Sequence, residues 1–188
     1  MSEVKILGIA GSLRAGSFNR KLLLNAQQLV PQGAKVDIYD LHGIPVFSED
    51  DEKSPPAKVT DFKARIRASD AILFATPEYN YSVPGGLKNA IDWASRPYGD
   101  SAWIGKPAAI IGASVGRMGS ARAQYHLRQT CVYLQVEVLN SPEIMISSAH
   151  ENFDSSGKLT HESSREALRD LLKALVDRVH LLRHVRAS

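Results

Sequence analysis

Three polar, glycine-containing loops carry the side chains that could do chemistry. The first, GSLRAGSFN at residues 11–19, brings hydroxyl, guanidinium and amide groups close together along the chain. A terminal phosphate monoester is close to a dianion with three free oxygens, so it is bound well by such a set of donors. We therefore expect this loop to bind a phosphate monoester through its polar residues, which are Ser12, Arg14, Ser17 and Asn19.

Two other interpretations of the first loop stay open. Gly8, Gly11 and Gly16 lack the G-x-G-x-x-G spacing of a dinucleotide fingerprint, although Asp40, after the next apolar run, could mimic its ribose-binding acid. Alternatively, Ser17 could serve only as the N-cap of the following helix. Arg14 would then be an ordinary surface residue.

The second loop, TPEYNYSVPGG at residues 76–86, is aromatic and stiff. Pro77 and Pro84 restrict the backbone, and the glycines at its end open the next helix with little bulk. Aromatic loop residues more often pack than bind a cofactor. Beside a phosphate-binding loop, however, this loop could hold a flat ring, with backbone amides reaching the polar edge of that ring.

The third loop begins at GASVGRMGSAR, residues 112–122. Gly112, Ser114 and Gly116 match G-x-S-x-G, the nucleophile elbow of serine hydrolases. A catalytic triad would then need Asp154 and either His150 or His161. Because this interpretation leaves the first two loops unexplained, we favour a glycine-rich loop whose amides and Ser114 hydroxyl contact a bound ring.

The elements around these loops predict an α/β fold. Five apolar runs and five segments of helical periodicity alternate along the chain, which favours a parallel sheet with right-handed crossovers and helices on both faces. Each loop follows a strand, so the loops should meet at the carboxyl edge, where open α/β sheets bind ligands. We expect one flavodoxin-like, doubly wound domain over residues 1–188, with a five-stranded sheet of order 2-1-3-4-5. The predicted strands are 4–9, 36–39, 71–75, 108–111 and 136–139, and the predicted helices are 22–30, 59–66, 87–93, 121–134 and 168–182.

Composition limits the kinds of partner and the cellular compartment that we expect for this chain. The 188 residues are 44% hydrophobic and carry a net charge of only +3, with basic residues scattered, so we expect neither a nucleic-acid nor a membrane partner. The single Cys131 cannot form an internal disulfide, and no signal-peptide pattern is present, which favours the cytoplasm. Cys131 should be a buried thiol. His180 and His184 lie four apart but lack a third ligand nearby, so we expect no metal site.

Three segments together resemble the NADPH-dependent FMN reductase family, which includes quinone, chromate and azo-dye reductases. They are residues 11–20, residues 77–93 (PEYNYSVPGGLKNAIDW) and the glycine-rich loop at 114–120. The resemblance runs from Val4 to about Glu143, and Gly86 departs from it where many members carry alanine. It implies a flavodoxin-like fold that binds FMN non-covalently. By resemblance, the phosphate is held by Ser12, Arg14, Ser17 and Asn19, the isoalloxazine by Pro77, Glu78, Tyr79 and Asn80, and its pyrimidine side by Ser114 and Gly116.

The same resemblance implies an oxidoreductase in which the flavin, and no side chain, carries the chemistry. NADPH or NADH would reduce FMN in a ping-pong cycle, and small-molecule acceptors such as quinones, chromate, azo dyes or free flavin would reoxidise it. Arg117 could meet the phosphates of NADPH or be a solvated loop residue. Arg122 and Tyr125 lie on a helical face that resembles the one through which members associate, so we expect a homodimer or homotetramer, with a monomer as the alternative.

A flavodoxin-type electron carrier is the alternative function from another class. Such a carrier binds FMN without using NAD(P)H, and it usually has an acidic docking face. The isoelectric point near 9.0 favours the enzyme. A serine hydrolase using Ser114 is a remoter alternative.

Overall fold

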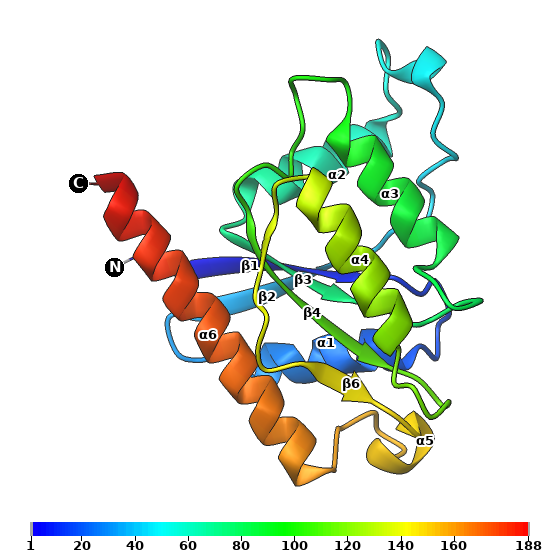
Figure 1. Cartoon of the computed structure of the whole chain (residues 1–188), viewed down its shortest axis with the longest axis vertical. Coiled ribbons are helices and arrows are strands. Elements are labelled where there is room, and N and C mark those ends of the chain that lie inside the picture. The colour runs from blue at the N-terminus through cyan, green and yellow to red at the C-terminus, as the bar shows by residue number, and fades with distance from the viewer. Residues whose placement is uncertain (1, 188) are drawn as a thin grey trace.

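A parallel β-sheet runs through the middle of the molecule (Figure 1). The computed structural model describes residues 2–187, with side chains described for residues 2–185. The strands follow the order β2-β1-β3-β4-β5, as predicted, with β6 also paired to β4. The four longer strands are β1 (Val4–Ala10), β2 (Ala34–Tyr39), β3 (Ala71–Ala75) and β4 (Pro107–Ala113).

Helices cover both faces of this sheet, which confirms the doubly wound prediction (Figure 1). Successive strand residues point to opposite faces, so Ile6 and Leu73 pack on one helical layer while Leu7 and Phe74 pack on the other. The first layer consists of α1 (Phe18–Leu29) and α6 (Glu162–Ala187), and the second of α2 (Ala57–Ala68), α3 (Gly85–Ser95) and α4 (Ala121–Tyr133).

The fifth strand position differs from the prediction, because two short strands share it. β5 (Glu137–Val138) pairs with the beginning of β4, and β6 (Ile144–Ile146) pairs with its end. Between them the chain leaves the sheet at a turn that contains Pro142, which has no N–H to donate to a ladder. The predicted strand 136–139 is therefore only the first half of this position.

The polar segment after β6 is ordered by a buried amide. It contains the short helix α5 (Ala149–Asn152) and a bridge between Phe153 and Leu159. Asn25, which is 3% exposed on α1, donates to the carbonyl of Gly157 at 2.9 Å and accepts from the N–H of Leu159 at 2.9 Å. This segment is thereby fastened to α1.

The prediction for Cys131 can be compared with the structure. Cys131 is buried as predicted, and burial raises the pKa of its thiol to about 12. Within residues 2–187 no helix combines the length and apolar character needed to cross a bilayer. Among the described side chains, no group of three His, Cys, Asp or Glu residues is arranged to hold a metal ion.

Replacing Asn25 tests the anchoring of the segment. We expect Asn25→Ala to lower the free energy of unfolding by about 2–4 kcal/mol, because it leaves two buried backbone groups without partners. Urea denaturation measures this loss, and hydrogen exchange at Leu159 should accelerate. Gln28→Ala, on the exposed side of the same helix, is the control and should change stability by less than about 0.5 kcal/mol. Equal stability of the two variants would contradict the anchoring role.

Candidate functional site

Three loops meet at the carboxyl edge of the sheet, as predicted. They span residues 11–17 after β1, 76–84 after β3 and 114–120 after β4 (Figure 1). Their first residues continue the sheet's hydrogen bonding, since Gly11 donates its N–H to Ala75 at 2.8 Å and Thr76 donates to Ile111 at 2.9 Å. The loops are therefore placed relative to one another by the strands.

The first loop keeps two hydroxyls close to its backbone. Ser17 is the N-cap of α1, and its Oγ accepts the N–H of Arg20 at 3.3 Å. Ser12 Oγ lies 3.1 Å from the hydroxyl of Tyr79, which joins the first loop to the second. Capping uses only an acceptor site of Ser17, so its O–H can still donate to an anion. The N-cap interpretation of Ser17 is correct and compatible with a binding role.

Asn19 joins the first helix to the third loop. Its side-chain Nδ2 donates to the carbonyl of Ala113 at 2.9 Å, and its Oδ1 accepts the N–H of Ala113 at 3.0 Å. The side chain is 2% exposed. These two bonds give Asn19 a structural role that the sequence did not indicate, and its phosphate contact stays a prediction that depends on the second Nδ2 hydrogen.

The unpaired arginines gather at this edge. Among residues 2–185, only Arg14, Arg20 and Arg117 have guanidinium groups without an ion pair or hydrogen bond; the other arginines have such partners. Arg14 lies in the first loop, Arg20 in the first turn of α1, and Arg117 in the third loop. Free guanidinium groups beside a helix N-terminus favour anion binding. Sequence reasoning missed Arg20, although its place three residues after the N-cap Ser17 could have indicated it.

Two hollows meet at Arg14. One, of about 370 Å³, is lined by the first two loops, and the other, of about 300 Å³, extends toward the end of β2. Asp40 lies on the second hollow, where the N–H and ring of His42 hold the pKa of its carboxyl below the usual value. The hollow of about 370 Å³ is lined by Gly11, Leu13, Arg14, Tyr79, Pro84, Gly85 and Gly86.

The second loop contains a tight turn at Tyr79–Ser82. The N–H of each end residue donates to the carbonyl of the other, at 3.1 and 3.0 Å. The central residues Asn80 and Tyr81 have φ angles of 49° and 68°, as in a two-residue type I′ turn. Asparagine tolerates this left-handed conformation, whereas tyrosine rarely adopts it.

Glu78 turns its side chain toward α4. Its carboxylate accepts the backbone N–H of Arg122 at 3.1 Å and forms an ion pair with the guanidinium of the same residue. This pairing raises the pKa of Arg122, whose guanidinium also lies over the ring of Tyr81. Because the Glu78 side chain is 8% exposed and engaged, any contact that it makes with a ligand comes from its backbone.

The third loop is held by the second half of the fifth strand position. Ser114 donates its N–H to Ile146 at 2.9 Å, and Ala149 donates to the carbonyl of Ser114 at 3.0 Å. The Ser114 Oγ accepts the N–H of Gly116 at 3.1 Å. These bonds leave the remaining backbone amides of this loop near the edge where the other loops meet.

The candidate hydrolase triad is not assembled among the described residues. Asp154 accepts N–H groups from its own loop, including that of Lys158 at 2.9 Å. His161 Nδ1 contacts the hydroxyls of neighbouring serines, and His150 lies beside Glu151. None of these groups forms a hydrogen bond with Ser114 in the described chain, so the G-x-S-x-G match has another explanation.

Packing explains Gly112. A Cβ at this position would lie 1.8 Å from the Ser120 Oγ and 2.7 Å from the carbonyl oxygen of Thr76. A Cβ at Gly116 would meet only the Ser114 Oγ, at 3.5 Å. The motif therefore combines a glycine required by close packing with a serine that orders its own loop.

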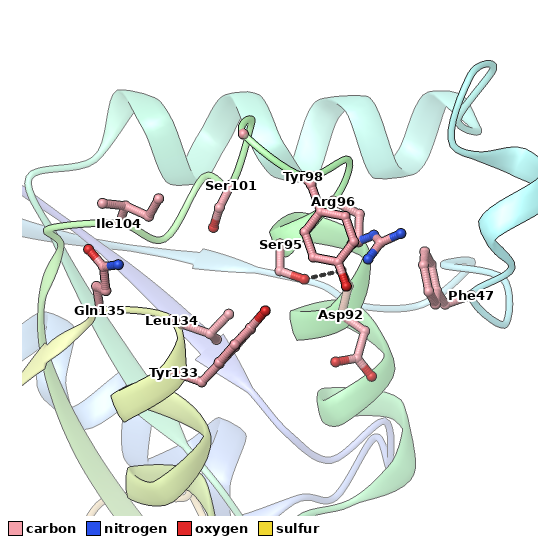
Figure 2. A pocket seen from close by; sticks show the side chains of 11 residues that line it. Phe47, Asp92, Ser95, Arg96, Tyr98, Ser101, Ile104, Tyr133, Leu134 and Gln135 are labelled. Atoms are coloured by element: carbon pink, nitrogen blue, oxygen red, sulfur yellow. Dashed lines mark hydrogen bonds between the residues drawn. The ribbon is translucent and has the colours of Figure 1, made fainter.

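A cavity of about 410 Å³ lies elsewhere, at the carboxyl ends of α3 and α4 (Figure 2). Figure 2 shows Tyr98 and Tyr133 beside this space, and both side chains are more than three quarters exposed. Arg96 is tied to Glu52, in the acidic loop that contains the short 3₁₀ helix η1 (Glu49–Asp51). None of the site residues expected from the sequence lines this cavity.

Comparisons with known proteins find a family model and relatives that match most of the chain. The family model described as NADPH-dependent FMN reductase matches residues 4–151. The chain is 56% identical over 175 residues to an NAD(P)H-dependent FMN reductase of Pseudomonas aeruginosa. This alignment covers 92% of the chain and 94% of the relative. It is 44% identical to a 2-hydroxy-1,4-benzoquinone reductase of a Burkholderia species, over 90% of this chain and 92% of the relative.

A solved structure is similar over nearly the whole chain. The flavoenzyme NAD(P)H:(acceptor) oxidoreductase FerB from Paracoccus denitrificans aligns with a TM-score of 0.87 and 37% identity, covering 94% of this chain and 97% of FerB. The two proteins therefore share the same overall fold.

Glycine substitutions test the packing of the third loop. We expect Gly112→Ala to lower the free energy of unfolding by about 2–3 kcal/mol, because the added methyl group overlaps the Thr76 carbonyl and Ser120 hydroxyl. Gly116→Ala serves as the control and should cost less than about 1 kcal/mol. Thermal and urea unfolding measure both values. Equal losses would contradict the different roles assigned to the two glycines.

Proposed function

The chain belongs to the NADPH-dependent FMN reductase family, and from that membership we propose that it is an FMN-dependent NAD(P)H oxidoreductase of the quinone reductase type. It would act as a single flavin-binding domain that passes two electrons from NAD(P)H to small acceptors. The observation that carries this proposal is the unpaired Arg14 beside the capped N-terminus of α1, at the edge where the three loops meet. In this proposal, that edge would bind the phosphate and the ring of the flavin together.

The first loop binds the FMN phosphate in this proposal. Ser12 and Ser17 would donate hydroxyl hydrogens, and Asn19 its second amide hydrogen. Arg14 would donate from its guanidinium, since none of its side-chain nitrogens is engaged by the described residues. The positive end of the α1 dipole adds to this attraction. These groups suit a dianionic phosphate better than the single charge per phosphorus of a pyrophosphate bridge.

The second and third loops line the isoalloxazine. Pro77, Glu78, Tyr79 and Asn80 would lie along the ring, with Glu78 contributing its backbone for the reason given above. Ser114 and Gly116 would close the pyrimidine side. Because the N–H groups of both residues are engaged within the chain, the donors that stabilise negative charge there would be the Ser114 O–H and the remaining backbone amides of the loop. When bound, FMN accepts hydride from NAD(P)H and passes electrons to the acceptor. The chain itself binds and orients the reactants, and no side chain is required as an acid or nucleophile.

The reductant and the acceptor would use one open ring face in turn, in a ping-pong cycle. Arg117 is free in the third loop and would contact the phosphates of NADPH. The acceptors we propose are quinones, as the names of relatives suggest, together with chromate, azo dyes and free flavin. An open site selects such acceptors by shape and reduction potential rather than by specific hydrogen bonds.

The active form would be a homodimer or homotetramer, built through α4 and located in the cytoplasm. Arg122 and Tyr125 are the interface residues that we propose. The support comes from the apolar side chains along this helix, because Tyr125, Val132 and Tyr133 are all more than half exposed. Large exposed apolar groups favour a protein partner. A second copy of the chain would bury them.

The visible spectrum is the first test of this function. We expect the protein reconstituted with FMN to lose its flavin absorption when NADPH or NADH is added without oxygen, and to regain it when a quinone is added. Bound flavin that stays oxidised would identify an electron carrier and contradict the enzyme. Failure to bind flavin would contradict the whole proposal, and a serine-directed inhibitor would then test Ser114.

Replacing Arg14 tests the phosphate site. We expect Arg14→Ala to raise the FMN dissociation constant by about 10- to 100-fold, the effect of losing one charge-assisted hydrogen bond. Quenching of flavin fluorescence measures the constant. Arg65→Ala removes the same side chain from an exposed position on α2 and is the matched control. Unchanged affinity in Arg14→Ala, with a folded protein, would refute the role assigned to the first loop.

A further inference from the structure

We propose that Arg122 is a positioning residue for the flavin-facing turn Tyr79–Ser82, which it holds in one conformation by pairing with Glu78 and stacking on Tyr81. The inference rests on the proposed function, because the ring contacts are assigned to this loop. It gives Arg122 a role within its own subunit, in addition to the interface role proposed above.

The turn needs contacts from outside it, because its backbone conformation is unfavourable for its sequence. Both central residues are left-handed, and the second is Tyr81, whose bulky side chain disfavours that conformation. Only two backbone hydrogen bonds close the turn, those between Tyr79 and Ser82. Tyr79 is 45% exposed and Tyr81 is 68% exposed, so core packing alone does not fix the turn.

Helix α4 supplies that support from one side. The Arg122 guanidinium carbon lies 3.5 Å from the centroid of the Tyr81 ring, which is stacking distance. One helical turn further along the same face, His126 Nδ1 lies 3.0 Å from the Ser82 hydroxyl. The first loop holds the opposite side through the contact of Ser12 with Tyr79.

Glu78 connects Arg122 to the start of the turn. The N-cap residue of α4, Ser120, makes no capping bond with its side chain. The Glu78 carboxylate takes that place, because it accepts the Arg122 N–H and lies at the positive end of the helix dipole. The Arg122 guanidinium then pairs with the same carboxylate and reaches on to Tyr81. One side chain thus fixes both the residue before the turn and the residue at its centre.

Arginine suits this position better than lysine. A planar guanidinium can bind a carboxylate with its edge while its face lies on an aromatic ring, whereas an ammonium group offers charge without a flat face. Arg122→Lys should therefore keep the pairing with Glu78 and lose most of the stacking. Arg122→Gln should lose both.

The experiment measures the stability of the turn and the affinity for FMN separately. In flavin-free protein, hydrogen exchange at the amides of Tyr79 and Ser82 should accelerate about tenfold in Arg122→Gln and less in Arg122→Lys, as expected for the loss of one ion pair and one stacked cation. The FMN dissociation constant should also rise more in Arg122→Gln than in Arg122→Lys. Lys173→Gln removes an exposed ion pair on α6 and should change neither quantity.

The outcomes separate the possible explanations. Faster exchange and weaker FMN binding at unchanged molecular mass, with partial rescue by lysine, support the proposal. Unchanged exchange overturns it, as does faster exchange with unchanged affinity. A loss of affinity that appears only when the oligomer dissociates also overturns it, because Arg122 would then act through the subunit contact. If the unmodified protein bound no FMN, the proposed function would fail, and exchange alone would still show whether Arg122 holds the turn.

Discussion

The two hydrogen bonds between the side chain of Asn19 and the backbone of Ala113 join parts of the molecule on which the site depends. They connect the first turn of α1, and so the loop before it, to the end of β4, where the third loop begins. Both bonds are buried, so breaking them would leave backbone groups unsatisfied at a substantial cost. Together with the pairing of the strands, this contact fixes the distance between the first loop and the third loop.

The second constraint on the site is the local distribution of positive charge. The net charge of +3 says little about the molecule, because most arginines are neutralised by partners within the chain. Among the described residues, the guanidinium groups of Arg14, Arg20 and Arg117 make neither an ion pair nor a hydrogen bond; all three lie near one edge of the sheet, where Arg20 is also attracted to the Asp40 carboxylate. An anionic cofactor and an anionic reductant would therefore meet their strongest attraction at the same place.

Much of the fold was predictable from the sequence, whereas the partners of individual side chains were not. Apolar runs and helical periodicity predicted the strand order, and topology then placed the three loops at one edge. The bond from Asn19 spans 94 positions and that from Glu78 spans 44, and no local pattern encodes such pairs. The split of the fifth strand position was missed because Ile144–Ile146 is too short to show a periodic signal.

The late position of β6 in the chain has a consequence for biosynthesis. A chain leaving the ribosome presents residues 11–84 long before Ile146 has been made, and a domain of this size takes about 10–40 s to translate at about 5–20 residues per second. Ser114 can form its bond with Ile146 only after that point, and α6 follows later still. The edge that would receive the flavin is thus completed by the last quarter of the chain. A nascent polypeptide, or one truncated before Ile146, lacks the bond that holds Ser114, so under the proposed function the cofactor would be loaded only onto the finished protein.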